Sequence, residues 1–140
     1  MAILGFDYGE KRIGVALANG EKRLAIPMTV IKRASKKADM DKVLDLIKQY
    51  DVERIIVGLP LSLDGTVGKQ AEDVLAFTRT LSQHIDVPVD TWDERFSTVE
   101  AESLFLDAGM KREKRREHRD AMAAAIILQG YIDNKKAHQG

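Results

Sequence analysis

The chain has 140 residues, which is enough for one domain and too few for two of ordinary size. It carries 22 basic and 22 acidic residues, and this zero net charge argues against a protein that binds nucleic acid indiscriminately over its whole surface. The absence of cysteine excludes disulfides, thiolate zinc sites and cysteine nucleophiles, and it is compatible with a cytoplasmic location.

The N-terminal part is expected to form three antiparallel strands. Residues 2–8 and 12–19 are mainly apolar and are separated by the short turn Gly9–Lys11, which predicts a β-hairpin. A third strand is expected over residues 24–31, where Pro27 indicates an edge position or a bulge because proline cannot donate a ladder hydrogen bond. We expect no signal peptide and no membrane span, because the N-terminus lacks a basic segment and no apolar stretch is long enough.

Helix and strand patterns alternate in the rest of the chain. The run at 54–58 is nearly all apolar, as in a parallel strand that is buried on both faces. Ser97 and Glu100 form a capping-box pattern that opens a helix, and Gly109 is a plausible end for it. The elements expected after the third strand are a helix over 36–50, a strand over 54–58, a helix around 71–81, a strand over 88–92, a helix from 97 and a final helix over 116–135.

This order predicts a single α/β domain over residues 1–140. Three antiparallel strands would be followed by parallel βα units in one mixed sheet, with helices on both faces. We see no repeat, linker or low-complexity segment that would divide the chain.

Three acidic residues lie at the boundaries of apolar segments. Asp7 interrupts the apolar run of the first strand and is followed by a basic turn that glycines bound on both sides. A carboxylate at the end of a buried strand is costly unless a cation compensates it. Glu94 and Asp120 occupy comparable boundaries. Because the chain has no cysteine and its three histidines match no ligand spacing, these acids indicate a site for a hard cation that acts on phosphates.

Asp120 is expected on the core-facing stripe of the final helix. A helical period places it on one face with four apolar residues, which are Ala124, Ile127, Leu128 and Tyr131. Alanines nearby would let this helix approach the sheet closely, so that Asp120 could meet Asp7. The alternative is that Asp120 interacts favourably with the helix N-terminal dipole or pairs with Arg116.

Glu94 follows the strand at 88–92, where parallel units gather functional groups. It could instead be a loop acid that is paired with Arg95. Asp93 competes with Glu94 for the same role, because a shift of one residue in register changes which acid points inward. We choose Glu94 for its longer reach.

The three acids predict a site for Mg²⁺ or Mn²⁺, with two ions. Mg²⁺ prefers oxygen ligands and uses carboxylates together with the phosphate oxygens of a substrate. A pair of such ions about 4 Å apart can activate a water and stabilise the leaving oxygen in phosphodiester hydrolysis. Asp7, Glu94 and Asp120 are therefore the candidate catalytic residues and metal ligands.

Basic residues near these acids are candidate phosphate contacts. Six of the nine residues from Lys111 to Arg119 are basic, directly before Asp120. The expected substrate-binding residues are Lys11, Arg12, Arg95, Lys114, Arg116 and Arg119. The loop at 59–68 could also hold a phosphate with its backbone amides, or it could simply be a turn.

These residues together resemble the YqgF family, also called RuvX, bacterial proteins of the RNase H-like superfamily related to the RuvC junction resolvases. Four segments in the expected order carry the resemblance: Gly5-Phe6-Asp7-Tyr8-Gly9 with Glu10-Lys11-Arg12-Ile13-Gly14-Val15-Ala16, Val57-Gly58-Leu59-Pro60-Leu61 with Asp64-Gly65-Thr66, Asp93-Glu94-Arg95-Phe96-Ser97-Thr98 with Ala101-Glu102, and Asp120 with Ala123-Ala124 and Ile127-Leu128-Gln129-Gly130-Tyr131. One departure is Glu117-His118-Arg119 before Asp120, where the family usually has a Lys-rich stretch and an apolar residue.

The resemblance implies an RNase H-like fold in which Asp7, Glu94 and Asp120 are the acidic metal-binding residues. It also implies a role in processing the 5′ end of pre-16S rRNA during ribosome biogenesis, or in Holliday junction resolution.

The leading interpretation is a metal-dependent nuclease whose partner is nucleic acid, with RNA favoured over DNA. The first alternative is a DNA junction resolvase, which would need two active sites in a fixed dimer. The chain is expected to be a monomer or a weak homodimer. A second alternative is a nucleic-acid-binding factor of the same fold with little activity. A third is a sugar-kinase or actin-like phosphotransferase, because the Asp7–Gly14 hairpin also resembles the phosphate loop of those ATPases, which normally close two domains over ATP.

Overall fold

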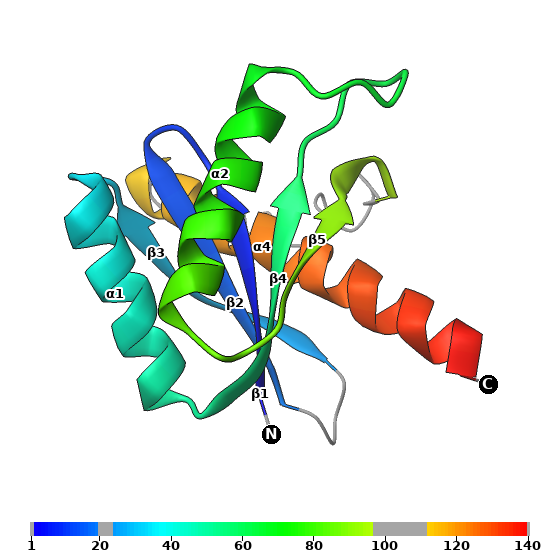
Figure 1. Cartoon of the computed structure of the whole chain (residues 1–140), viewed down its shortest axis with the longest axis horizontal. Helices are drawn as coiled ribbons and strands as arrows, with labels where there is room; N and C mark the ends of the chain where they lie inside the picture. The colour runs from blue at the N-terminus through cyan, green and yellow to red at the C-terminus, as the bar shows by residue number, and fades with distance from the viewer. Residues whose placement is uncertain (1, 20–23, 97–111, 140) are drawn as a thin grey trace.

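The computed structural model describes residues 2–19, 24–96 and 112–139, without the side chains of 96, 112–117 and 136–139. These residues form a five-stranded mixed sheet with helices on both faces (Figure 1). The strands are β1 (Ala2–Tyr8), β2 (Arg12–Asn19), β3 (Ala25–Lys32), β4 (Val52–Leu59) and β5 (Val89–Asp93). The helix expected from residue 97 falls outside the described residues.

The sheet has the strand order β3-β2-β1-β4-β5, which confirms the predicted arrangement. β1 pairs antiparallel with β2, and β2 pairs antiparallel with β3. On its other side β1 pairs parallel with β4, and β4 pairs parallel with β5. The register of β2 and β3 shifts where Pro27 lies opposite Ala16, so Pro27 is both on an edge strand and at an irregularity, as expected.

Two helices cover one face of the sheet and a third covers the other face (Figure 1). The helices are α1 (Lys36–Gln49), α2 (Lys69–His84) and α4 (Arg112–Gln139), and a short 3-10 turn, η1 (Glu94–Phe96), follows β5. α4 begins earlier than the expected residue 116, because the Arg, Lys and Glu residues of its first turns are good helix formers. It also ends later than the expected residue 135. None of the helices in the described residues is long and apolar enough to cross a membrane.

Each face of the sheet has its own apolar core. Leu4 and Phe6 of β1 point to the face of α1 and α2, where they pack in one cluster with Val43 and Val74. The alternate residues of the strands face α4. There the core is built from small and medium side chains, namely Ala16, Ala18, Ile56, Ala124, Ala125, Ile127, Leu128 and Ile132.

α4 lies unusually close to the strands beneath it. A Cβ atom added at Gly5 would lie 2.8 Å from Cβ of Leu128, and one at Gly14 would lie 1.9 Å from the backbone oxygen of Asp120. Both distances are shorter than real Cβ contacts, so these strand positions accept α4 only because they have no side chain. The close contact brings Asp120 of α4 directly onto β2.

Candidate active site

The candidate site lies at the carboxyl ends of β1 and β4, on the sheet face covered by α4. Asp7 of β1 pairs with Gly14 of β2. On the other side of β1, Phe6 pairs with Val57, so Gly58 of β4 lies next to Asp7. Asp7 therefore lies in a row between two glycines, and atoms of α4 and Glu94 fill the positions that side chains at these glycines would take.

Glu94 occupies the space above Gly58. A Cβ atom at Gly58 would lie 3.2 Å from Cγ and Cδ of Glu94, because η1 folds the Glu94 side chain back over the end of β4. Burial raises the pKa of Glu94 to about 7, and the carboxylates of Asp7 and Asp93 add to the rise. Because Glu94 lies over Gly58 and Gly58 neighbours Asp7 in the sheet, the two acids, 87 positions apart in the sequence, approach each other in the fold.

Asp93 is held differently from its neighbour Glu94. Its carboxylate accepts hydrogen bonds from Nε of Arg95 at 2.9 Å and from Nη2 at 2.6 Å. These bonds lower the pKa of Asp93. In β5, Trp92 faces α4 and packs edge-on against Tyr131, so strand alternation directs Asp93 to the opposite face. The register thus favours Glu94 over Asp93 as the partner of Asp7.

Asp120 reaches the site from α4. Its backbone lies on Gly14, the residue that pairs with Asp7. Its carboxylate accepts a hydrogen bond from Nε of Arg12 at 2.5 Å, and the two side chains form an ion pair that joins α4 to β2. Because α4 begins at Arg112, Asp120 lies too far along the helix for its N-terminal dipole to explain the acid.

The three carboxylates are not equally close. Within residues 2–19, 24–96 and 112–139, no group of three acids or histidines is close enough together to hold a metal ion. Asp7 and Glu94 approach each other, whereas the carboxylate of Asp120 is bound by Arg12 beside the same row of residues. The assignment of all three acids as metal ligands therefore stays a prediction, which the placement of their backbones favours.

The expected phosphate contacts fall into three groups. Lys11 and Arg119 are exposed. Arg12 and Arg95 contact Asp120 and Asp93 respectively, so their guanidinium groups are already paired within the protein. The other two expected contacts, Lys114 and Arg116, have side chains outside the part of the chain that the structure describes.

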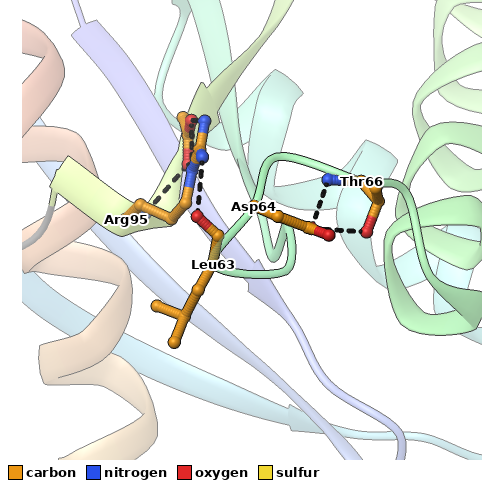
Figure 2. Close-up of polar contacts among 5 residues, drawn as sticks. Leu63, Asp64, Thr66 and Arg95 are labelled. Carbon is orange, nitrogen blue, oxygen red and sulfur yellow. Dashed lines mark hydrogen bonds and ion pairs between the residues drawn. The ribbon is translucent and has the colours of Figure 1, made fainter.

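The loop between β4 and α2 is an ordered turn next to this site. The backbone N–H of Gly65 donates to the oxygen of Ser62 at 2.7 Å, and Asp64 accepts hydrogen bonds from the backbone and hydroxyl of Thr66 (Figure 2). Nη1 of Arg95 donates to the oxygen of Leu63 at 3.3 Å, which ties the loop to η1. The expectation of a turn at this loop is confirmed, and its role in phosphate binding stays a prediction.

Arg33 supports the turn after Asp7, a role that no sequence motif indicates. Its Nη1 donates to the oxygen of Gly9 at 3.1 Å, and its backbone N–H donates to the oxygen of Lys11 at 2.9 Å. Nε of Arg33 also donates to Asp39, which is buried. The β2–β3 register places Arg33 beside this turn, and no local sequence pattern encodes that contact.

Comparison with known proteins shows which family the chain is similar to over most of its length. The model of the RuvX family, which is described as a Holliday junction resolvase, matches residues 1–134. The chain belongs to the RuvX family. A RuvX relative from Desulforamulus reducens, named "Putative pre-16S rRNA nuclease", is 48% identical over 134 residues that cover 96% of this chain and 98% of the relative. A relative of the same name from Halothermothrix orenii is 43% identical over the full length of both chains.

Solved structures confirm the RNase H-like fold of this RuvX family member. The RuvC protein of Thermus thermophilus in complex with a Holliday junction substrate has a TM-score of 0.64 at 16% sequence identity, and the match covers 98% of this chain and 96% of that one. A fowlpox virus resolvase in complex with Holliday junction DNA has a TM-score of 0.58 at 12% identity, with 96% and 99% covered.

Proposed function

We propose that the protein is a metal-dependent nuclease that hydrolyses phosphodiester bonds at the site of Asp7, Glu94 and Asp120. The observation that carries the proposal is the close approach of Asp7 and Glu94 at the strand ends of a RuvX family fold. The raised pKa of Glu94 means that its ionised form is costly in this position, and a bound cation would offset that cost. Family membership also argues against the phosphotransferase alternative.

The donor set fits Mg²⁺ or Mn²⁺, with two ions. Asp7 and Glu94 would hold them with carboxylate oxygens, and Asp120 would join when its carboxylate turns from Arg12. Bound cations of this type supply an activated water and stabilise the charge on the leaving oxygen. The site has oxygen donors only, which suits a hard cation better than zinc.

The chain's own side chains provide binding and proton transfer. Glu94 can accept the proton that the attacking water loses and pass it to the leaving oxygen. Lys11 and Arg119 are exposed and can neutralise the phosphates that flank the cleaved bond. Arg12 can exchange its contact with Asp120 for a substrate phosphate, which would couple substrate binding to the release of that carboxylate.

The proposed substrate is the 5′ end of pre-16S rRNA, cleaved in the cytoplasm during ribosome biogenesis. The names of the relatives at 41–48% identity support RNA. The family description and the junction complexes of proteins with the same fold support the alternative, a four-way DNA junction. A monomer or weak homodimer is proposed with the RNA substrate, because a single cut needs one active site whereas symmetric junction cleavage needs two.

One panel of assays tests this proposal. Purified protein is incubated with Mg²⁺ or Mn²⁺ and with single-stranded RNA, pre-16S rRNA or four-way junction DNA. We expect cleavage of the precursor RNA, and we expect Asp7→Asn and Asp120→Asn to abolish cleavage while binding persists. Asp45→Asn is the matched control, because Asp45 is an exposed acid of α1 on the opposite face of the sheet.

The outcomes separate the candidate functions. Cleavage of junction DNA but not RNA by a stable dimer would favour the resolvase. Binding without cleavage by the wild-type protein in both metals would favour the non-catalytic factor. Equal cleavage by wild type and the folded Asp7→Asn variant would contradict the proposed site.

A further inference from the structure

The loop between β4 and α2 presents an apolar side chain at its tip. Ser62 and Gly65 close a tight turn through the 2.7 Å hydrogen bond described above, and Gly65 adopts a positive φ of 86°. Leu63 is the second residue of this turn, a position that accepts most side chains. The turn therefore does not need leucine. Even so, the side chain of Leu63 is 96% exposed.

The tip is fixed in place beside the candidate site. Nη1 of Arg95, the residue after Glu94, donates to the oxygen of Leu63, and Asp93 holds the same guanidinium. The contact between Asp64 and Thr66 closes the other side of the loop. Figure 2 shows the Leu63 side chain pointing away from Asp64 and Thr66. The loop thus presents the apolar side chain of Leu63 to solvent at a defined place.

Exposed apolar side chains are common when they are scattered, and Leu24 at 58% and Ile26 at 57% are such cases. Leu63 differs from them in position. Leu24 directly precedes β3, and Ile26 of β3 pairs with Leu17 of β2, away from Gly14. Leu63 instead belongs to a loop that is bonded to η1, and α2 places exposed Lys69 directly after the same loop. A loop that carries an exposed apolar side chain, contacts Arg95 and leads into Lys69 can meet both the bases and the phosphates of a nucleic acid.

We propose that Leu63 is a wedge that contacts a nucleobase where base stacking in the bound nucleic acid is interrupted. This inference rests on the proposed nuclease function and specifies the kind of substrate. Leucine is among the side chains that proteins insert between base steps. Separating stacked and paired bases has a cost, which is smallest at a mismatched or unpaired base. The wedge therefore favours a bulge, fork or junction over a continuous duplex.

Binding measurements test the wedge without relying on cleavage. The Asp7→Asn variant, which we expect not to cut, is mixed with Mn²⁺ and with a duplex that carries 2-aminopurine beside a single-base bulge. The continuous duplex of the same sequence serves as the reference. We expect binding to the bulged duplex to increase 2-aminopurine fluorescence. Adding Leu63→Ala should weaken this binding by roughly fivefold to tenfold and remove the fluorescence increase.

Matched variants show whether the effect is specific to an apolar tip. Leu63→Phe should retain both tight binding and the fluorescence increase, and Leu63→Asn should behave like Leu63→Ala. Leu24→Ala makes the same change at a remote exposed leucine and should have no effect. Because Leu63 is exposed, all of these variants should melt within about one degree of their parent.

The outcomes distinguish the wedge from the function on which it rests. Loss of affinity confined to the bulged duplex supports the wedge. If Leu63→Ala binds both duplexes as tightly as its parent, or loses the same affinity for both, the wedge is overturned and the nuclease proposal stays intact. Unchanged binding to both duplexes would make a protein the better candidate for the partner that contacts Leu63. If the parent protein binds neither duplex nor the RNA panel, the proposed function and the wedge both fail.

Discussion

At the scale of single residues, the site depends on the positions of two acids, Asp7 and Glu94. Asp7, the next-to-last residue of β1, lies between two glycines, and Glu94 folds over one of them. Burial then raises the pKa of Glu94 to about 7, from an ordinary value of 4.5. A folded state that binds a proton more tightly than the unfolded state loses stability as the pH rises between these two values.

Replacing Glu94 with glutamine should reduce this pH dependence. Without metal, the free energy of unfolding of the wild type should fall between pH 4.5 and about 7 and then level off, whereas Glu94→Gln should show a smaller fall. At pH 8 in EDTA we expect Glu94→Gln to be more stable by ~1–2 kcal/mol, a figure reduced for solvent screening. Urea denaturation at pH 5 and pH 8 measures the free energy of unfolding of the wild type and of the variant. The same change in this free energy between the two pH values for both proteins would show that Glu94 ionises normally in the folded chain.

At the scale of elements, α4 and the sheet meet through backbone rather than side chains. The oxygen of Asp120 would be 1.9 Å from a Cβ atom at Gly14, and Ile127 Cδ1 would be 2.4 Å from one at Gly58. Strand glycines often mark such close approaches. They were the signal in the sequence that could have located the contact between α4 and the two strands.

Adding one methyl group at Gly14 should separate α4 from the sheet. The Cβ of Gly14→Ala meets a backbone oxygen that cannot rotate away, so we expect a loss of ~1–3 kcal/mol in the free energy of unfolding. Cleavage should fall further than the folded fraction does, because Asp120 is displaced. Gly68→Ala is the control, since its nearest non-neighbouring atom is Ser62 Oγ at 4.0 Å, and it should change stability by less than about 0.5 kcal/mol. Chemical denaturation and the RNA assay together give both results, and equal stability of the two variants would contradict the close-packing account.

Local sequence patterns predicted the strands and helices well. The directions of the site side chains depend on long-range contacts, which such patterns do not contain. The β1–β2 hairpin, the Pro27 irregularity and the parallel β4 and β5 strands were all correctly predicted, because each has a signal within a few residues. The ion pair of Arg12 with Asp120 joins residues 108 positions apart, and it decides the direction of a carboxylate that periodicity could only place on a helix face. The choice between Asp93 and Glu94 likewise needed the register of β5.

At the scale of the whole molecule, the two faces of the sheet have separate tasks. The face covered by α1 and α2 holds the larger apolar cluster, including Phe6 against Phe77. The face covered by α4 holds smaller side chains and the acids. Stability from the first face can therefore compensate for the cost of placing carboxylates close together on the second.

Divalent cations should stabilise the whole protein if the acids are their ligands. At a concentration about 100-fold above the dissociation constant, Mg²⁺ or Mn²⁺ should add ~2.7 kcal/mol to the free energy of unfolding. The melting temperature of the wild type should rise accordingly, and Asp7→Asn should respond much less. Differential scanning calorimetry measures the shift, with Asp45→Asn as the variant that should respond like wild type. An unchanged melting temperature, together with no heat of binding in titration calorimetry, would remove the main support for a metal site.

The position of α4 after all five strands has a consequence for the newly made chain. Asp7 belongs to the first strand to leave the ribosome, but Asp120 belongs to a helix that is made after all five strands. The proposed ligand set therefore stays incomplete while the strands are being synthesised, and we expect a nascent chain that lacks α4 to leave the RNA around it uncut. Docking of α4 on the finished sheet completes the set.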